Sequence, residues 1–167
     1  MTTSEVQTTR RGKGWAGIVF VVLYVVGLLM LGGAAPDNAD KKPFKDNPVK
    51  LSALWRAYYN DSGHRWMIII AVYIVLAATI AFVVFGNDLR ERLEASGART
   101  TAVLVLAGAI IFAVATAIGA LALGWIPGSK QLGGAPVPHG ELNYLSSQLG
   151  YGILLVPGGG EIGRAHV

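Results

Sequence analysis

Four ionisable side chains stand at the edges of apolar segments and have the right chemistry for ligand binding: His64, Arg65, His139 and Glu141. Imidazole and carboxylate groups are zinc ligands, and a guanidinium group binds carboxylates or phosphates. The two histidines lie far apart in the chain, however, and neither belongs to an HExxH helix. We therefore predict no metal and no cofactor, and treat the four residues as a candidate polar cluster on the outer face.

Motifs of the common enzyme classes are missing from the chain. It contains no cysteine, no GxSxG nucleophile elbow and no Walker loop. The apolar stretches 15–33, 66–85 and 102–125 contain no Asp, Glu, Lys, Arg or His, although such groups usually mark proton relays inside membranes. We predict that the protein is not an enzyme. An enzyme with its site on the outer face, built on the four residues above, is a weaker alternative.

The composition indicates a membrane protein. Hydrophobic residues make up 53% of the 167 residues and charged residues only 14%, against about 25% charged residues in soluble domains. A spanning helix needs about 17–25 apolar residues. We predict an all-α, polytopic transmembrane helix bundle over residues 15–160, with three full spans, a truncated fourth span and a short interfacial amphipathic helix. The predicted spans cover 15–33, 66–85, 102–125 and 142–157.

The first apolar stretch has two interpretations. Residues 1–14 are polar, and we predict a disordered cytoplasmic tail whose Arg10, Arg11 and Lys13 precede the first span. The same residues would form the basic region of a signal peptide, with Gly32 to Ala35 as a small-residue cleavage site. We favour an uncleaved helix, because the apolar stretch is long for a signal peptide and further spans follow.

Residues 48–60 are predicted to form the amphipathic helix. Asn47 is a good helix cap and Pro48 suits the first turn. Helical spacing then places Trp55, Tyr58 and Tyr59 on one face. We expect this aromatic face to meet lipid headgroups or the bundle. An aromatic lid over a binding site is the functional alternative.

The third span is rich in small residues at four-residue intervals, which lets helix backbones approach closely in lipid. The predicted packing residues are Ala109, Ala113, Ala117, Thr116, Ala120 and Gly124. The expected partners are the lipid bilayer and, in addition, other membrane helices or further copies of the chain. The net charge of +4 comes from residues between the spans, so we predict no nucleic-acid partner.

The C-terminal residues can be encoded by a DNA sequence that suggests an artefact. The segment 162–167 can be encoded ATC GGA AGA GCA CAC GTC, which resembles the start of a common short-read sequencing adapter. We therefore expect 161–167 to be an artefactual tail. On this interpretation the chain is a fragment, its authentic frame ends near Gly160, and one or more spans are missing.

Lys and Arg are nearly equally divided between the two sides of the predicted spans, so the positive-inside rule gives little guidance. The compact basic cluster before the first span favours a cytoplasmic N-terminus. We predict a multi-pass protein of the bacterial inner membrane.

Two local motifs suggest a resemblance. Residues 58–65 read YYNDSGHR, and residues 89–93 read LRERL after the second span. This order of features resembles uncharacterised actinobacterial integral membrane proteins similar to the DUF4386-like group. The resemblance implies a bundle of about six spans and carries over no catalytic residue.

The sequence thus favours an integral membrane protein with a non-enzymatic accessory or structural role. A transporter or permease for an apolar or lipid-like molecule is the alternative, because uncharged spans are compatible with such a cargo. The aromatic helix 48–60 would then be the gate.

Overall fold

The computed structural model describes residues 14–33, 36, 47–138 and 140–155. Every regular element in these residues is a helix, which confirms the all-α prediction. The helices are α2 (Trp15–Gly32), α4 (Pro48–Asn60), α5 (Ser62–Ala95), α6 (Arg99–Gly133) and α7 (Gly140–Leu155). The predicted tails 1–14 and 161–167 lie outside the described residues, except for Gly14.

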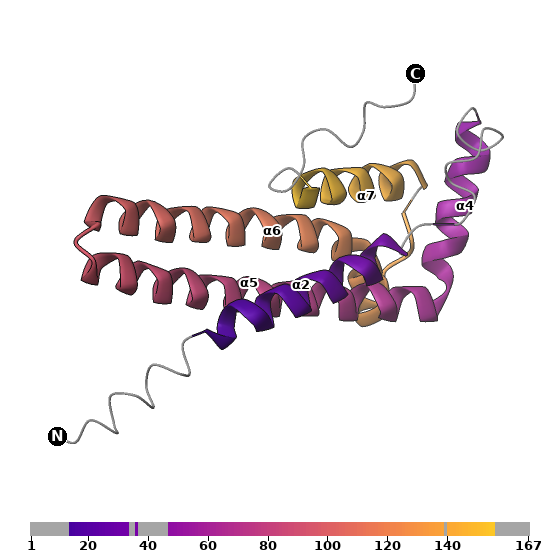
Figure 1. The fold of residues 1–167 in the computed structure, drawn as a ribbon. Coiled ribbons are helices and arrows are strands. Elements are labelled where there is room, and N and C mark those ends of the chain that lie inside the picture. Colours follow the sequence, from indigo (N-terminus) through magenta and orange to yellow (C-terminus); the bar gives the residue numbers. More distant parts are fainter. Residues whose placement is uncertain (1–13, 34–35, 37–46, 139, 156–167) are drawn as a thin grey trace.

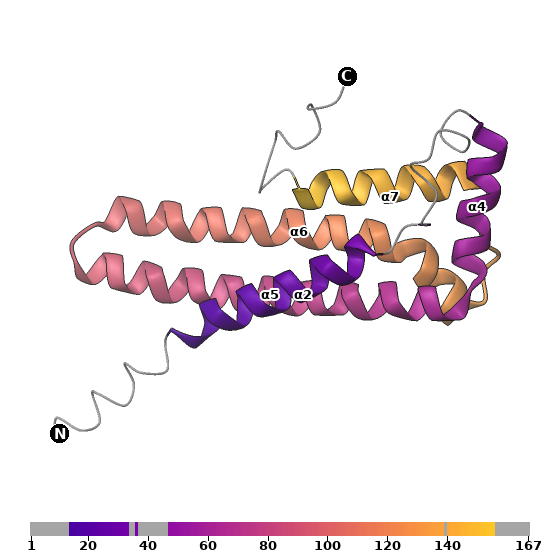
Figure 2. The same cartoon turned by 45° about the vertical axis from the view of Figure 1, so that its right-hand side comes forward.

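Three of these helices, α2, α5 and α6, are long and apolar enough to cross a membrane. Figures 1 and 2 show α5 and α6 as a long pair, with α2 along α5, α7 along α6, and α4 running across one end. At 34 residues, α5 is about 50 Å long, whereas the hydrocarbon core is about 30 Å thick. The α5–α6 hairpin is therefore longer than the core requires.

Local chemistry explains where α4 and α5 begin. The Asn47 side chain accepts a hydrogen bond from the Lys50 backbone N–H at 3.1 Å, and Pro48 opens α4 as predicted. The Asp61 carboxylate accepts from the His64 backbone N–H at 2.9 Å and begins α5. Each cap satisfies a backbone donor that has no partner within its helix.

A glycine in the left-handed region ends α5. Gly97 has φ 86°, a conformation that costs glycine little. The Ala98 N–H then donates to the Leu93 carbonyl at 2.9 Å, and the Gly97 N–H donates to the Glu94 carbonyl at 3.0 Å. These two bonds form a Schellman motif. The charged segment after Phe85 is thus a continuation of the second span's helix.

The third span was predicted to end at residue 125 before a Gly/Pro-rich connection, but the helix itself is longer: α6 continues through Pro127 to Gly133. Proline lacks an N–H and removes one helical hydrogen bond, but neighbouring groups in membrane helices compensate for such losses. Pro127 is buried, and the Ser129 hydroxyl donates to the Ile126 carbonyl at 3.0 Å. The helix ends where Gly134 adopts φ 66°.

Small residues set the spacing between the long helices. A Cβ built on Gly86 would lie 2.6 Å from the Ala109 Cβ, and one on Gly124 would lie 3.1 Å from Val72. These pairs fix α5 and α6 as antiparallel neighbours. One turn further along α5, a Cβ on Gly27 of α2 would lie 2.6 Å from Val75. The close approach of three helices therefore depends on glycine.

The contact between α6 and α7 is equally close. A Cβ on Gly119 would lie 3.1 Å from the Gly150 carbonyl, and one on Gly150 would lie 3.0 Å from the Gly119 carbonyl. Backbone meets backbone at this point, so no side-chain movement could make room. This contact follows the small-residue rule for helices in lipid.

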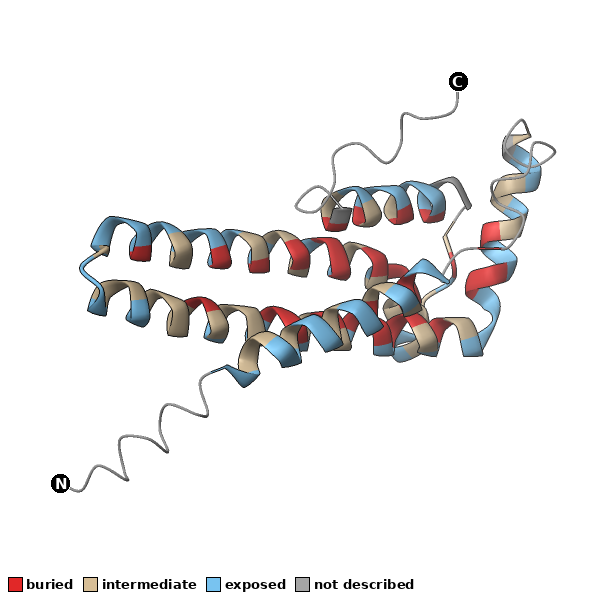
Figure 3. Cartoon of the chain, in the orientation of Figure 1, coloured by how far each residue is buried: buried red, intermediate tan, exposed pale blue. Residues whose placement is uncertain are grey.

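The main core cluster connects the end of α2, helix α4, the first turns of α5, the end of α6 and helix α7. Figure 3 shows the buried residues on the facing sides of α4, α5, α6 and α7, whereas α2 is largely exposed. The cluster consists of Leu31, Trp55, Tyr58, Tyr59, Ile68, Ala71, Val72, Val75, Ala120, Leu123, Ile126, Val137 and Leu154. We call this end of the bundle the corner end.

Of the predicted packing residues of the third span, Ala109, Ala113, Thr116 and Ala120 are buried. Ala117 and Gly124 are partly buried.

Candidate functional site

The predicted polar cluster is only partly described by the structure. His64 and Arg65 lie in the first turn of α5 at the corner end. His139 lies outside the described residues, and the side chain of Glu141 in the first turn of α7 is not described. In the part of the chain that the structure describes, no three His, Cys, Asp or Glu side chains gather as a metal site would require.

Arg65 is a buried structural connector. Its side chain is only 9% exposed. Its Nη1 donates to the carbonyls of Tyr59 at 2.9 Å and Asn60 at 2.6 Å, and its Nε donates to the Gln131 side-chain oxygen at 2.7 Å. One guanidinium group therefore joins the end of α4, the start of α5 and the last turn of α6.

The end of α4 explains why an arginine is suited to this position. The last carbonyls of a helix lack intrahelical partners and carry partial negative charge. The backbone turns extended at Asp61, with φ −72° and ψ 127°, so α4 cannot supply those partners itself. Arg65 satisfies two of its carbonyls, and no carboxylate pairs with it among the described residues. These contacts assign Arg65 a role in positioning the helices.

His64 links the same corner to α2. Its ring stacks on Tyr58 with 4.1 Å between centroids and 18° between planes, and the Tyr58 hydroxyl donates to the Gly33 carbonyl at 3.3 Å. His64 Nδ1 also lies 3.3 Å from the Asp61 carboxylate. The hydrogen bond from the His64 backbone N–H, followed by the nearby charges of His64 and Arg65, lowers the pKa of Asp61. Asp61 is therefore ionised at neutral pH.

The aromatic face of α4 packs against the bundle. The sequence had left open whether this face meets the bundle or lipid headgroups. Trp55 and Tyr59 are each 2% exposed and Tyr58 is 9% exposed. The Trp55 ring lies 6.3 Å from that of Tyr144 in α7, at an interplanar angle of 62°. Burial also raises the pKa of the Tyr59 hydroxyl, with smaller contributions from Tyr151 and Tyr58. These side chains are part of a packed core.

Polar residues along one face of α7 were not identified from the sequence. The Ser146 hydroxyl donates to the Ala122 carbonyl of α6 at 2.7 Å. Asn143 is fully buried and its Nδ2 donates to the Pro138 carbonyl at 3.4 Å, whereas Ser147 is 2% exposed. The spacing of residues 143, 146, 147 and 150 is helical. This row of polar and small residues in an otherwise apolar segment could have indicated the packed face of α7 from the sequence.

Two buried threonines lie in the middle of the α5–α6 pair. The Gly86–Ala109 and Gly124–Val72 contacts place Thr79 level with Thr116. The Thr79 hydroxyl donates to the Leu76 carbonyl of its own helix at 2.7 Å. Thr116 is fully buried, and its hydroxyl has no hydrogen-bond partner in the described part of the chain. Both hydroxyls are neutral, so neither is suited to act as a general acid or base near neutral pH.

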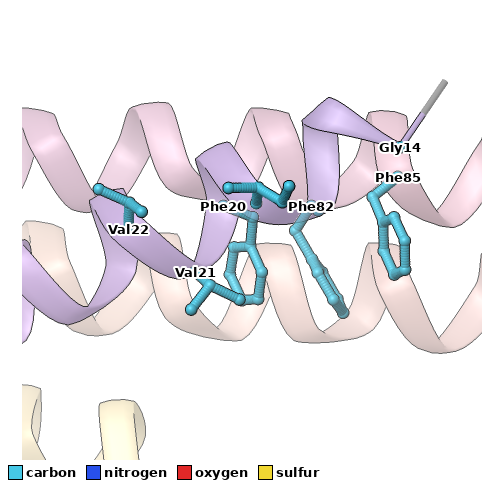
Figure 4. Close-up of a pocket in the computed structure, with 8 residues that line it drawn as sticks. Gly14, Phe20, Val21, Val22, Phe82 and Phe85 are labelled. Carbon is cyan, nitrogen blue, oxygen red and sulfur yellow. The ribbon is translucent and has the colours of Figure 1, made fainter. Parts of the chain in front are cut away.

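A groove lies between α2 and α5, away from the corner end (Figure 4). It has a volume of about 520 Å³, and its lining is apolar: Gly14, Gly17, Ile18, Phe20, Val21, Val22, Phe82 and Phe85. The ring centroids of Phe20 and Phe82 are 4.5 Å apart, and those of Phe82 and Phe112 are 4.7 Å apart. This groove was not predicted, because it depends on where α2 crosses α5.

Comparisons with known proteins give no further identification: no protein family, curated protein or solved structure matches the chain. The assignment of function therefore depends on the sequence and the geometry.

Proposed function

We propose that the protein is a non-enzymatic accessory or structural helix bundle of the bacterial inner membrane. Three helices with membrane-spanning length and apolarity are the observation that carries this proposal. Their predicted span stretches contain no ionisable side chain except tyrosine. Arg65, the buried charged side chain of the described residues, donates three hydrogen bonds, to two carbonyls and a glutamine. These features favour a scaffold over a catalytic or proton-coupled protein.

A cytoplasmic N-terminus is part of the proposal. Arg10, Arg11 and Lys13 immediately precede α2, and Gly17 near the start of α2 packs beside Phe85 of α5. The start of α2 therefore lies on the same side of the bundle as the α5–α6 turn, which carries Arg90, Arg92 and Arg99. Lys and Arg are nearly equally divided between the two sides, so the compact basic cluster before α2 is the observation that favours the cytoplasm for this side. The resemblance to uncharacterised actinobacterial membrane proteins remains a prediction.

A permease for an apolar or lipid-like molecule is the second candidate. The apolar groove between α2 and α5 favours it, because lipid-like cargo needs an apolar path. The burial of Trp55, Tyr58 and Tyr59 argues against α4 as a freely moving gate.

A lipid-scrambling assay separates the two candidates. The purified chain would be reconstituted into vesicles that contain a fluorescent phospholipid, and dithionite would bleach the outer leaflet. A scaffold leaves the inner-leaflet fraction protected, as in protein-free vesicles. Rapid bleaching of that fraction would contradict the scaffold and support the permease. Vesicles with a known scrambling protein provide the positive control.

A further inference from the structure

Among the described residues, four buried side-chain atoms have no hydrogen-bond partner: Trp55 Nε1, His64 Nδ1, Thr116 Oγ1 and Asn143 Oδ1. A buried polar atom without a partner costs free energy, so each of them needs an explanation. The His64 side chain is partly exposed, so bulk water reaches this residue. The Thr116 hydroxyl can rotate to donate to a carbonyl of its own helix, as the Thr79 hydroxyl does. Neither explanation applies to Trp55 and Asn143.

Trp55 and Asn143 lie in the same part of the molecule, where α4 packs against α7. The Trp55 ring contacts the ring of Tyr144, which follows Asn143 in the chain. Trp55 also belongs to the same core cluster as Val137, and the next residue, Pro138, accepts a hydrogen bond from the Asn143 amide. The two unpaired atoms are therefore neighbours at the corner end.

The two atoms are complementary in their hydrogen-bonding chemistry. An indole N–H only donates, and an amide oxygen only accepts. Each side chain is held by other contacts: the Trp55 ring packs on the rings of Tyr58, Tyr59 and Tyr144, and the Asn143 Nδ2 donates to the Pro138 carbonyl. A water molecule can accept from the indole and donate to the amide across a gap of about 5–6 Å. Both side chains then keep the contacts that they have.

The surroundings favour water over a larger or charged ligand. Trp55 is 2% exposed and Asn143 is fully buried, so an occupant must be small. Neither group carries a charge, which favours a neutral occupant over an ion. A buried water makes about two to four hydrogen bonds. Ser147, buried one turn after Asn143 on the same face of α7, offers its hydroxyl as a third partner.

We propose that α4 and α7 enclose a binding site for one water molecule, which accepts the Trp55 indole N–H and donates to the Asn143 amide oxygen. The bound water is a structural part of the bundle, because it joins the helix across the corner end to the last described helix. The site goes beyond the scaffold role and does not depend on it.

The first test is detection of this water beside Trp55 by NMR of the full chain in lipid nanodiscs. The chain contains four tryptophans, and Trp55→Phe identifies the indole signal of Trp55. We expect a nuclear Overhauser effect between this indole N–H and water, with the sign of a long-lived contact. An indole N–H without a water contact, or with the sign of freely diffusing water, would overturn the proposal.

Variants on α7 test the second partner of the water. Asn143→Leu should abolish the water contact of Trp55, whereas Gln148→Leu, which is exposed on the same helix, should leave it unchanged. Persistence of the contact in Asn143→Leu would refute the bridge. Asn143→Ala replaces Asn143→Leu if the larger side chain prevents folding.

A double-mutant cycle, measured by SDS titration in mixed micelles, tests the link between the two residues. Trp55→Phe should raise the unfolding equilibrium constant about five-fold more in the native chain than in the Asn143 variant, where the bridge is already lost. Trp55→Phe and Thr116→Val should act independently within about two-fold, because Thr116 lies in the α5–α6 pair. Independent effects of Trp55→Phe and the Asn143 variant would contradict the shared water.

Discussion

The two ends of α5 place arginine side chains in opposite environments. At the corner end, Arg65 is buried and pairs with no described carboxylate, but its guanidinium makes three hydrogen bonds to groups on α4 and α6. At the opposite end, where residues 96–98 connect α5 to α6 and which we call the hairpin end, Arg90 forms a 2.7 Å ion pair with Glu94, yet both side chains are more than a third exposed. Burial and the number of satisfied partners, rather than the presence of an ion pair, therefore determine how much an arginine contributes.

The difference follows from solvation. An exposed i,i+4 pair gains little over two hydrated charges, typically a few tenths of a kcal/mol. Removal of a buried charged donor leaves its acceptors unpaired, which costs about 1–3 kcal/mol for each group that water cannot reach. The corner end should accordingly be sensitive to substitution, and the hairpin end should tolerate it.

The largest expected effect is that of Arg65→Leu. The change leaves the Tyr59 and Asn60 carbonyls and the Gln131 side chain without their donor. We expect a loss of about 3 kcal/mol in the free energy of unfolding, measured by SDS titration in mixed micelles. Arg56→Leu, exposed on α4, is the control and should change little. Equal effects of the two changes would show that Arg65 does not stabilise the contact of α4, α5 and α6 at the corner end.

Gly150→Leu should have the next largest effect. Its Cβ would lie 2.5 Å from the Leu123 side chain and 3.0 Å from the Gly119 carbonyl, so α7 must move away from α6. We expect about 1–3 kcal/mol of destabilisation in the same titration. Gly152→Leu is the matched control, because nothing lies within 4 Å of a Cβ at that position. A tolerated Gly150→Leu would show that α7 does not pack as described.

Ionisation of Asp61 should make the stability of the corner end depend on pH. Its pKa is lower in the folded protein than in the unfolded chain, so its contribution is present above the unfolded pKa of about 3.9. That contribution is lost as the pH falls through the folded pKa. Asp61→Asn keeps a capping oxygen but cannot ionise. The difference in Tm between the two proteins should shrink below about pH 4, as the Asp61 carboxylate becomes protonated. A Tm difference that does not change with pH would show that ionisation of Asp61 does not stabilise the protein.

Arg90→Ala should have the smallest effect. We expect a loss of a few tenths of a kcal/mol, which should vanish at high salt because the pair is exposed. A double-mutant cycle with Glu94→Ala measures the pair itself. A coupling above about 1 kcal/mol would mean that the hairpin end is more protected from water than its exposure indicates.

The sequence predicted those features of the fold that depend on local pattern. The first span was expected at 15–33 and α2 covers Trp15–Gly32, because a polar tail and glycines delimit an uninterrupted apolar run. The 48–60 helix was expected from Asn47 and Pro48, and both have the predicted role. The continuation of α6 through Pro127 was missed, because proline usually ends a helix.

The roles of individual site residues were harder to predict. Arg65 was expected at a polar outer face, but its partners are backbone carbonyls of a preceding helix and a glutamine 66 residues away. No local pattern encodes that distant contact. The groove beside Phe85 likewise depends on the α2–α5 crossing. In contrast, the spacing of Asn143, Ser146 and Ser147 was visible in the sequence, so the polar face of α7 could have been predicted.

We expect the corner end and the hairpin end of the bundle to lie on opposite sides of one membrane. The chain has no cysteine, so single-cysteine labelling with a membrane-impermeant maleimide tests this claim directly. In intact cells we predict labelling of Ala53→Cys on α4, labelling of Ser96→Cys only after permeabilisation, and no labelling of the lipid-facing Ile80→Cys in either case. Labelling of Ala53→Cys and Ser96→Cys from the same side, or of Ile80→Cys in the membrane, would contradict the account.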